Sequence, residues 1–141
     1  MTSSFGRMLG DDELVEQAKQ ARQQAYAPYS NFPVGAALLT KSGRVFTGAN
    51  VENAVHGLAI CAERNAIFQA VAHGERGFEA IAVVTEPGAT PCGACRQVMQ
   101  EFDNGSFRII VADTAGNYRT YTLPNLLPDA FGADDLPTSS T

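Results

Sequence analysis

Three cysteines and one glutamate carry the most distinctive chemistry of this sequence. Cys61 precedes Glu63 by two residues, and Cys92 and Cys95 lie within the segment PCGAC at 91–95. Three thiolates can hold a zinc ion and leave its fourth position for water, whereas a structural zinc site normally takes four protein ligands. A carboxylate close to one ligand can exchange protons with that water. The spacing therefore predicts a catalytic zinc site with Cys61, Cys92 and Cys95 as ligands and Glu63 as the proton carrier.

Two predicted helices would bring these ligands to one point. Residues 61–72 have the apolar pattern of a buried helix with Gly74 as its C-terminal cap, and another helix is expected to follow Pro91. Cys92 and Cys95 then lie at the start of that second helix, on one face of it. We therefore expect the N-termini of two helices to point at one metal ion.

The charge of such a site needs compensation, because three thiolates on a divalent cation leave a net negative charge. The positive ends of two helix dipoles would oppose that charge. Arg64, directly after Glu63, is predicted to donate from its guanidinium to the sulfurs and to act in the same direction. His73, next to Gly74 at the predicted helix end, is expected to make a helix-cap interaction instead.

Each motif taken alone has a simpler interpretation. A lone CxxC is more often redox-active or structural than catalytic, and a lone CxE carries little information. A thioredoxin-like CxxC should open the helix after an early strand, and it accounts for neither Cys61 nor Glu63. Together, the motifs are typical of zinc deaminases, in which a glutamate that is not a ligand precedes a downstream PCxxC.

Composition indicates one globular domain, residues 1–141. The chain is 45% hydrophobic and 18% charged, which is ordinary for a folded domain of this length. Its formal net charge is −5, and no window forms a Lys/Arg cluster. Nucleic-acid binding depends on basic side chains that neutralise phosphates, so we expect a small, uncharged substrate and no nucleic-acid partner.

The sequence also indicates where the protein works. The longest apolar runs, at 81–84 and 109–112, are far too short to span a membrane, and the start MTSS is followed by no hydrophobic signal segment. An odd number of cysteines disfavours a disulfide scaffold. We expect a cytoplasmic protein with no membrane partner, and we expect residues 1–10 and 135–141 to be flexible.

The apolar periodicity predicts a layered α/β fold with a mixed sheet. Residues 11–26 should form an amphipathic helix that ends before Pro28, and residues 50–57 a polar loop. A hairpin turn is expected at 42–43, and a short turn of helix near 123–127. Five strands are expected, at 34–40, 44–48, 78–85, 107–112 and 118–122.

Across residues 25–136 the sequence resembles the small homotetrameric cytidine deaminases. The likeness rests on AYAPYSNFPVGAA at 25–37, NVEN at 50–53, CAER at 61–64, PCGACRQ at 91–97 and LPDAFG at 127–132. It implies a three-layer cytidine deaminase-like fold, with a mixed five-stranded sheet flanked by helices, one Zn²⁺ per subunit and a homotetramer.

The resemblance also implies a reaction. It is the hydrolytic deamination of cytidine and 2′-deoxycytidine to uridine and 2′-deoxyuridine with release of ammonia, as part of pyrimidine salvage. The nucleophile would be a zinc-bound hydroxide, and Glu63 would shuttle its protons.

Substrate-binding roles follow from the same resemblance. It implies that Phe32 stacks on the pyrimidine and that Asn50 and Glu52 bind the ribose hydroxyls. The backbone N–H of Ala62 would meet the pyrimidine carbonyl, and Phe131 would reach the pocket of a neighbouring subunit. Without the resemblance, Phe32 would be assigned to the core and the NVEN segment to a turn.

One departure from the family pattern is His56, which stands where these enzymes commonly have a tyrosine. We expect His56 to keep a polar contact in the pocket without binding zinc. Two alternatives remain at this point. One is a zinc deaminase of another substrate, such as a nucleotide, a nucleoside antibiotic, a free base or a cytosine in nucleic acid. The other is a non-catalytic, zinc-stabilised scaffold; iron can also take sulfur ligands, although thiolates favour zinc.

Overall fold

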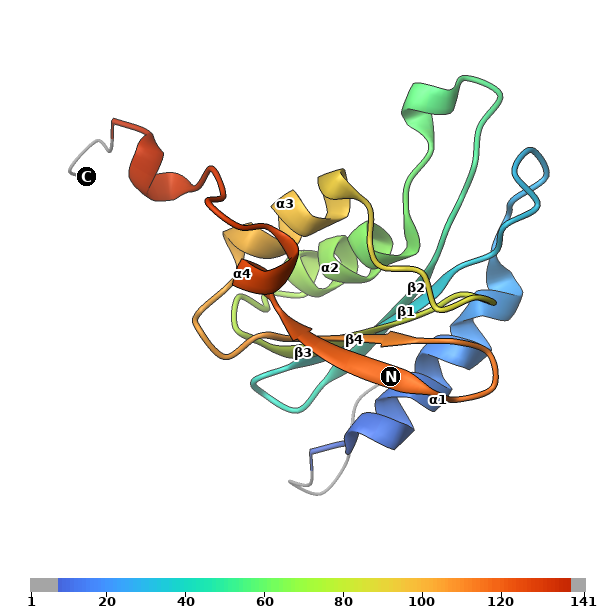
Figure 1. The fold of residues 1–141 in the computed structure, drawn as a ribbon, viewed down its shortest axis with the longest axis horizontal. Coiled ribbons are helices and arrows are strands. Elements are labelled where there is room, and N and C mark those ends of the chain that lie inside the picture. The colour runs from blue at the N-terminus through green and yellow to red at the C-terminus, as the bar shows by residue number, and fades with distance from the viewer. Residues whose placement is uncertain (1–7, 138–141) are drawn as a thin grey trace.

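A computed structural model describes residues 8–137, which form a five-stranded mixed sheet with helices on both faces (Figure 1). The strand order is β2-β1-β3-β4-β5, with β3 and β4 parallel and the other neighbours antiparallel. The predicted layered fold is confirmed. The helices are α1 (Asp11–Ala21), α2 (Ala62–Ala72), α3 (Gly93–Glu101) and α4 (Leu123–Leu126), and the strands are β1 (Gly35–Thr40), β2 (Val45–Ala49), β3 (Phe78–Val84), β4 (Arg108–Ala112) and β5 (Tyr118–Thr122).

The first helix is shorter than the predicted 11–26, so that boundary was wrong. A 3₁₀ turn follows α1, and the chain becomes extended at Ala25. The cause is pairing with a distant segment: the N–H of Tyr26 donates to the carbonyl of Asn50 at 2.9 Å, and its carbonyl accepts from the N–H of Glu52 at 2.8 Å. These backbone hydrogen bonds override the helical periodicity of the sequence, which continues to Ala25.

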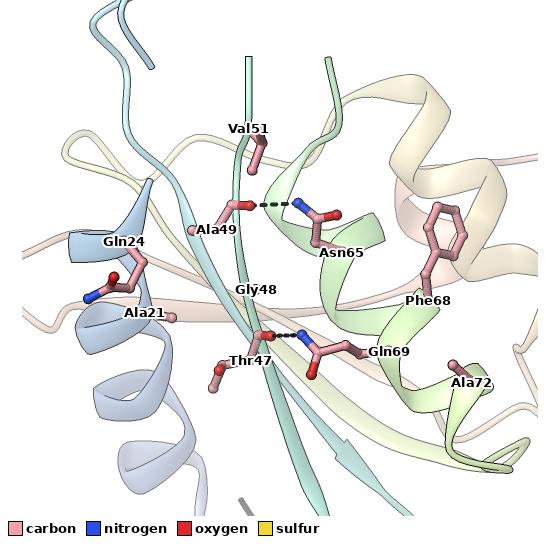
Figure 2. A pocket seen from close by; sticks show the side chains of 10 residues that line it. All are labelled: Ala21, Gln24, Thr47, Gly48, Ala49, Val51, Asn65, Phe68, Gln69 and Ala72. Carbon is pink, nitrogen blue, oxygen red and sulfur yellow. Dashed lines mark hydrogen bonds between the residues drawn. The ribbon is translucent and has the colours of Figure 1, made fainter. Parts of the chain in front are cut away.

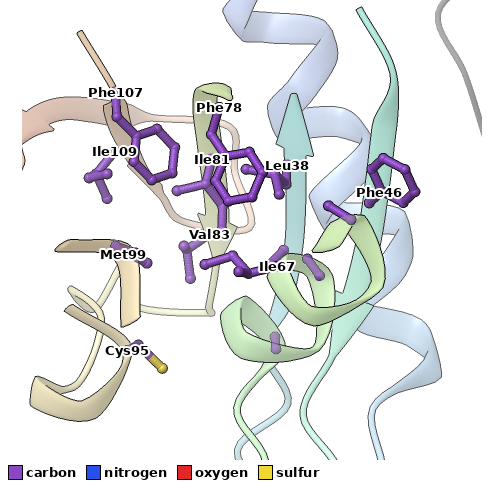
Figure 3. Close-up of a cluster of buried hydrophobic side chains, with 14 of the residues drawn as sticks. Leu38, Phe46, Ile67, Phe78, Ile81, Val83, Cys95, Met99, Phe107 and Ile109 are labelled. Atoms are coloured by element: carbon purple, nitrogen blue, oxygen red, sulfur yellow. The ribbon is translucent and has the colours of Figure 1, made fainter. Parts of the chain in front are cut away.

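The sheet separates two hydrophobic clusters, because alternate side chains of a strand point to opposite faces. On one face, Leu14, Val15 and Ala18 of α1 pack on β1, β3 and β4. On the other face, α2, α3 and α4 cover a larger cluster (Figure 3). Its largest members include Leu38, Phe46, Ile67, Phe78, Ile81, Met99, Phe107 and Ile109.

Helix α2 lies close along the edge strand β2. Asn65 and Gln69 each donate a side-chain N–H to a backbone carbonyl of β2, at 2.7 and 3.0 Å (Figure 2). Gly48 makes this approach possible, because a Cβ there would lie 2.5 Å from the carbonyl oxygen of Ala62. The close packing positions the N-terminal end of α2, and with it Cys61.

Helix α2 ends as predicted. Gly74 has φ +89°, and the N–H groups of Gly74 and Glu75 each donate a hydrogen bond of 3.0 Å to a carbonyl of the last helical turn. The predicted cap interaction of His73 is confirmed, since its Nδ1 lies 2.8 Å from the carbonyl oxygen of Gln69.

The expected flexibility of the chain ends stays a prediction. Residues 1–7 and 138–141 lie outside the described residues, and Ala133–Asp135 form a 3₁₀ turn. Within residues 8–137, no helix combines the length and the hydrophobicity that a bilayer crossing requires.

Candidate metal centre and active site

The three cysteines converge as the sequence predicts. The Sγ atoms of Cys61 and Cys92 are 3.7 Å apart, those of Cys92 and Cys95 are 3.4 Å apart, and all three lie within 4.8 Å of one another. Within residues 8–137, no other group of three or more His, Cys, Asp or Glu side chains is arranged to hold a metal ion.

Local helix geometry explains this convergence. Cys61 is the N-cap of α2 and Cys92 is the N-cap of α3, and both have extended backbone dihedrals. Their carbonyls accept the first intrahelical hydrogen bonds, at 3.1 and 3.0 Å. Cys95 lies in the first turn of α3 and is fully buried. Two helix N-termini therefore meet at the sulfurs, where their partial positive charge favours thiolates.

The sulfur positions fit a zinc ion. Three sulfurs at corners of a tetrahedron, each about 2.3 Å from zinc, would be roughly 3.8 Å apart. The separations of 3.7 and 3.4 Å are close to that value. An all-thiolate donor set is also one that favours zinc over magnesium or calcium. Cys61, Cys92 and Cys95 would hold the ion.

The charge distribution in the cluster favours a cation. A hydrogen bond from the Cys95 thiol, helped by the Arg64 guanidinium, lowers the pKa of Cys61 to about 5. The same hydrogen bond raises the pKa of Cys95, because the Cys95 proton is held between the two sulfurs and is harder to remove. The Nη2 of Arg64 lies 3.4 Å from the Sγ of Cys61, as predicted from its place in the sequence. A divalent ion would remove the repulsion that otherwise opposes ionisation of all three sulfurs.

Glu63 is placed for proton transfer. Its side chain is buried, with 4% exposure, and this burial raises its pKa to about 7; the charge of Cys61 acts in the same direction. A carboxyl group with a pKa near neutrality can both accept and donate a proton. Glu63 does not belong to the sulfur group, so the arrangement leaves it available as an acid or base.

A cavity of about 420 Å³ is lined by Cys61, Cys92 and Glu63. Most of the predicted substrate-binding residues line it, although they come from separate parts of the chain. Within this wall the ionisable side chains are two glutamates and two cysteines, and no Lys, Arg or His is present. The lining residues are Ser30, Phe32, Val34, Asn50, Glu52, Cys61, Ala62, Glu63, Val83, Thr85, Ala89, Thr90 and Cys92.

Asn50 and Glu52 hold the loop that carries Phe32. The Oδ1 of Asn50 accepts the N–H of Val34 at 2.9 Å, and its Nδ2 donates to the carbonyl of Phe32 at 3.0 Å. Hydrogen bonds to the Glu52 carboxylate, first of all from the hydroxyl of Ser30, lower the pKa of Glu52. Phe32 is 39% exposed and faces the cavity rather than the core.

Two predicted site residues lie apart from this cavity. Phe131 is 57% exposed and is not part of the cavity wall, while its carbonyl accepts a hydrogen bond from Gln97 at 2.8 Å. His56 lines an adjoining pocket of about 290 Å³, where its ring centroid is 6.2 Å from that of Tyr29. That pocket shares Ser30 and Glu52 with the cavity, so His56 lies beside the site and not at the sulfurs.

Sequence reasoning missed two residues that shape the cavity. Thr85, 3% exposed, accepts the N–H groups of Gly88 and Ala89 on its Oγ1, at 3.0 and 2.7 Å. Arg96 donates to the carbonyls of Pro91 and Leu126 and to the Oγ1 of Thr90, at 2.6–2.9 Å. Thr85 is a polar residue at the carboxyl end of β3, and binding sites of α/β proteins often lie at that end of a strand. This position could have indicated from the sequence that Thr85 lies near the site.

A larger depression, of about 610 Å³, lies between α1, β2 and α2 (Figure 2). It is lined by residues such as Gln24, Val51 and Phe68 and contains no cysteine, histidine or acidic side chain. Size alone therefore does not locate the active site. We assign the chemistry to the smaller cavity, because Cys61, Cys92 and Glu63 line it.

Comparison with protein families agrees with this geometry. The model of the cytidine and deoxycytidylate deaminase zinc-binding region matches residues 8–111, which contain all three cysteines and Glu63. The chain belongs to this family. It is accordingly a zinc-dependent hydrolytic enzyme of the deaminase class, and the zinc-stabilised scaffold is excluded.

Individual relatives cover nearly the whole chain. A cytidine deaminase of Sporosarcina psychrophila is 49% identical over 127 residues, 89% of this chain and 93% of the relative. The crystal structure of a cytidine deaminase from Burkholderia pseudomallei has a TM-score of 0.84 and 52% identity, and the match covers 87% of this chain and all of the other. A cytidine deaminase structure from Mycobacterium tuberculosis has a TM-score of 0.76 and 41% identity, and the match covers 88% of this chain and 98% of the other.

The metal centre can be tested by removing one ligand. The Cys61→Ser variant should lose its zinc, because two thiolates and a hydroxyl bind the ion far more weakly than three thiolates. His56→Ala is the matched control, since His56 lies outside the sulfur group and should leave about one zinc per chain. Elemental analysis after dialysis measures both. Retained zinc in Cys61→Ser, or lost zinc in His56→Ala, would contradict the assignment.

Proposed function

We propose that this protein deaminates cytidine and 2′-deoxycytidine to uridine and 2′-deoxyuridine, releasing ammonia. One observation carries the proposal: Cys61, Cys92 and Glu63 open onto the same cavity as Phe32 and Asn50. The cavity thus combines a metal site and a proton carrier with an aromatic face and a polar side chain. Its volume of about 420 Å³ lies within the usual range for small-molecule sites.

Glu63 would carry the protons of the reaction. When bound, zinc supplies a Lewis acid that lowers the pKa of a coordinated water toward about 7. Glu63 would take a proton from the attacking water and deliver it to N3 of the pyrimidine ring. The water oxygen would bond to C4 as a hydroxyl. Glu63 would then take the proton of this hydroxyl and hand it to the amino group, so that the C4–N bond breaks, ammonia leaves and the C4 carbonyl of the uridine product forms. Its burial and raised pKa support both directions of transfer.

The substrate would be held by the groups that the resemblance assigns. The ring of Phe32 offers a stacking face worth about 1–3 kcal/mol per base. Asn50 keeps one free amide hydrogen and one free acceptor site after its two bonds to the loop, so it can still bind a sugar hydroxyl. Ala62 is the first residue of α2, where backbone N–H groups have no intrahelical acceptor and can meet the pyrimidine carbonyl.

The charge of the cavity favours a nucleoside over a nucleotide. Its wall contains Glu52 and Glu63 and no basic side chain, so a phosphate there would meet like charge without a partner. A cytosine in nucleic acid would additionally need basic groups along the strand, and the formal net charge is −5. We infer a role in pyrimidine salvage in the cytoplasm, where a reducing environment keeps the three cysteines available as ligands.

A substrate panel tests the proposed function. Cytidine and 2′-deoxycytidine should release ammonia, whereas cytidine monophosphate should show kcat/KM lower by at least about tenfold, because repulsion and desolvation of its phosphate are uncompensated. Cytosine and a short single-stranded oligonucleotide serve as the remaining comparisons, and a chelator should abolish the signal. A preference for the monophosphate, the free base or the oligonucleotide would refute the nucleoside assignment.

The proton carrier has its own test. Glu63→Gln keeps the shape of the side chain but cannot exchange protons, so turnover of cytidine should fall by about 10²–10⁴ or more. Zinc content, measured on the same preparation, should stay at about one per chain, because Glu63 is outside the sulfur group. Activity within tenfold of the parent protein would remove Glu63 from this role.

We further propose a homotetramer in which Phe131 of one subunit reaches the pocket of another. Phe131 is exposed and does not line the cavity of its own chain, which supports this proposal. Sedimentation at micromolar concentration should give the mass of four chains, about 60 kDa from the 15.0 kDa of one. A monomeric mass combined with full activity would be incompatible with a shared pocket.

A further inference from the structure

The loop before β1 carries Phe32 and has an unusual backbone. Asn31 has φ 57°, in the left-handed region that asparagine adopts more readily than most other residues with a side chain. Its N–H donates to the carbonyl of Ala27 at 3.0 Å, which closes a turn that ends next to Phe32. Further hydrogen bonds hold this turn in place. The surrounding contacts are therefore relevant to where the aromatic ring lies.

A single carboxylate supplies several of these contacts. The Oε1 of Glu52 accepts the N–H groups of Tyr29 and Ser30, at 2.9 and 3.1 Å. Its Oε2 accepts a hydrogen bond from the hydroxyl of Ser30. A carboxylate has about four acceptor sites, so the loop occupies three of them and leaves about one for a ligand. Glu52 thus serves the loop as well as any sugar that enters the cavity.

The hydroxyl of Ser30 joins the two halves of this arrangement. Besides donating to Glu52, its Oγ accepts the N–H of Phe32 at 3.1 Å. Among residues 8–137, the Ser30 side chain alone is hydrogen-bonded both to the Glu52 carboxylate and to the backbone of Phe32. It also lines both the cavity and the adjoining pocket.

We propose that Ser30 is a positioning residue for substrate binding: its hydroxyl locks Glu52 and Phe32 into one arrangement before the substrate arrives. The proposal rests on the proposed function, because it assumes that Phe32 and Glu52 contact the nucleoside. Ser30 lies on the loop and makes no contact with the sulfurs or with Glu63 in the described hydrogen bonds. Its effect should therefore fall on binding and not on the chemical step.

The expected consequence is a split between KM and kcat. Stacking and sugar contacts act equally on the bound substrate and on the transition state, so weakening them raises KM and leaves kcat nearly unchanged. In Ser30→Ala, KM for cytidine should rise about tenfold, as expected for the loss of one to two hydrogen bonds. The kcat should change by less than about threefold. Ser30→Thr, which keeps the hydroxyl, should restore most of the binding.

Ser106→Ala is the matched control. The Oγ of Ser106 also makes two side-chain hydrogen bonds, donating to Asn104 and accepting from Lys41, both at 2.9 Å, but it lies outside the cavity. This variant should leave KM unchanged. An unchanged KM in Ser30→Ala, a loss confined to kcat, or an equal rise of KM in Ser106→Ala would each overturn the proposal.

Hydrogen exchange of the ligand-free protein separates positioning from direct contact. If hydrogen bonds order the loop before the substrate binds, the amide hydrogens of Tyr29 and Phe32 should be protected from exchange in the parent protein. The same amide hydrogens should exchange faster in Ser30→Ala. If Ser30 merely touched the substrate, the ligand-free exchange of the two proteins would be the same, and the proposal would be wrong. Should Ser30→Ala fail to fold, unprotected amides in the parent protein or in Ser30→Thr would be equally decisive.

These readouts also distinguish failure of this proposal from failure of the proposed function. A parent protein that does not deaminate cytidine refutes the function, and the exchange experiment then still reports on the loop. A parent protein that is active, with Ser30→Ala indistinguishable from it, refutes the positioning role alone.

Discussion

The meeting of two helix N-termini at one point is the constraint on which the rest of the structure depends. Cys61 and Cys92 cap α2 and α3, so their sulfurs can approach only if both helices lie on the same face of the sheet. The core under these helices and the close approach at Gly48 supply that placement. Metal affinity here is therefore a property of helix packing as much as of cysteine chemistry.

The electrostatics of the site follow from the same packing. The N-terminal ends of α2 and α3 and the Arg64 guanidinium place positive charge beside the sulfurs. They therefore offset part of the negative charge of three thiolates, and a bound metal ion would offset the rest. Glu63, in the first turn of α2, is buried by the same contacts, and the loss of water raises its pKa toward neutrality. The start of one helix thus provides a metal ligand, a cationic side chain and a buried carboxyl group within four residues.

The side of the cavity formed by Asn50, Glu52 and Phe32 is built on a different principle. Asn50 and Glu52 each make two hydrogen bonds to the backbone of the loop that carries Phe32, which is about half of their hydrogen-bonding capacity. The two side chains proposed to bind the sugar are thereby held in place by the loop, and they hold the loop in turn. Because these hydrogen bonds already order the loop, less conformational entropy would be lost when a ligand binds.

The sequence by itself determined the three metal ligands, the contact of Arg64 with the sulfurs and the strand and helix content, because these depend on local spacing and on apolar periods of about two and 3.6 residues. The end of α1 was wrong, since pairing of Tyr26 with residues 50–52 is a contact between distant segments that no local pattern encodes. The tertiary structure alone decided the roles of Thr85 and Arg96 in shaping the cavity. It also decided that Glu52 accepts hydrogen bonds from Tyr29 and Ser30, because hydrogen-bond partners are set by proximity in the folded chain and not by position along it.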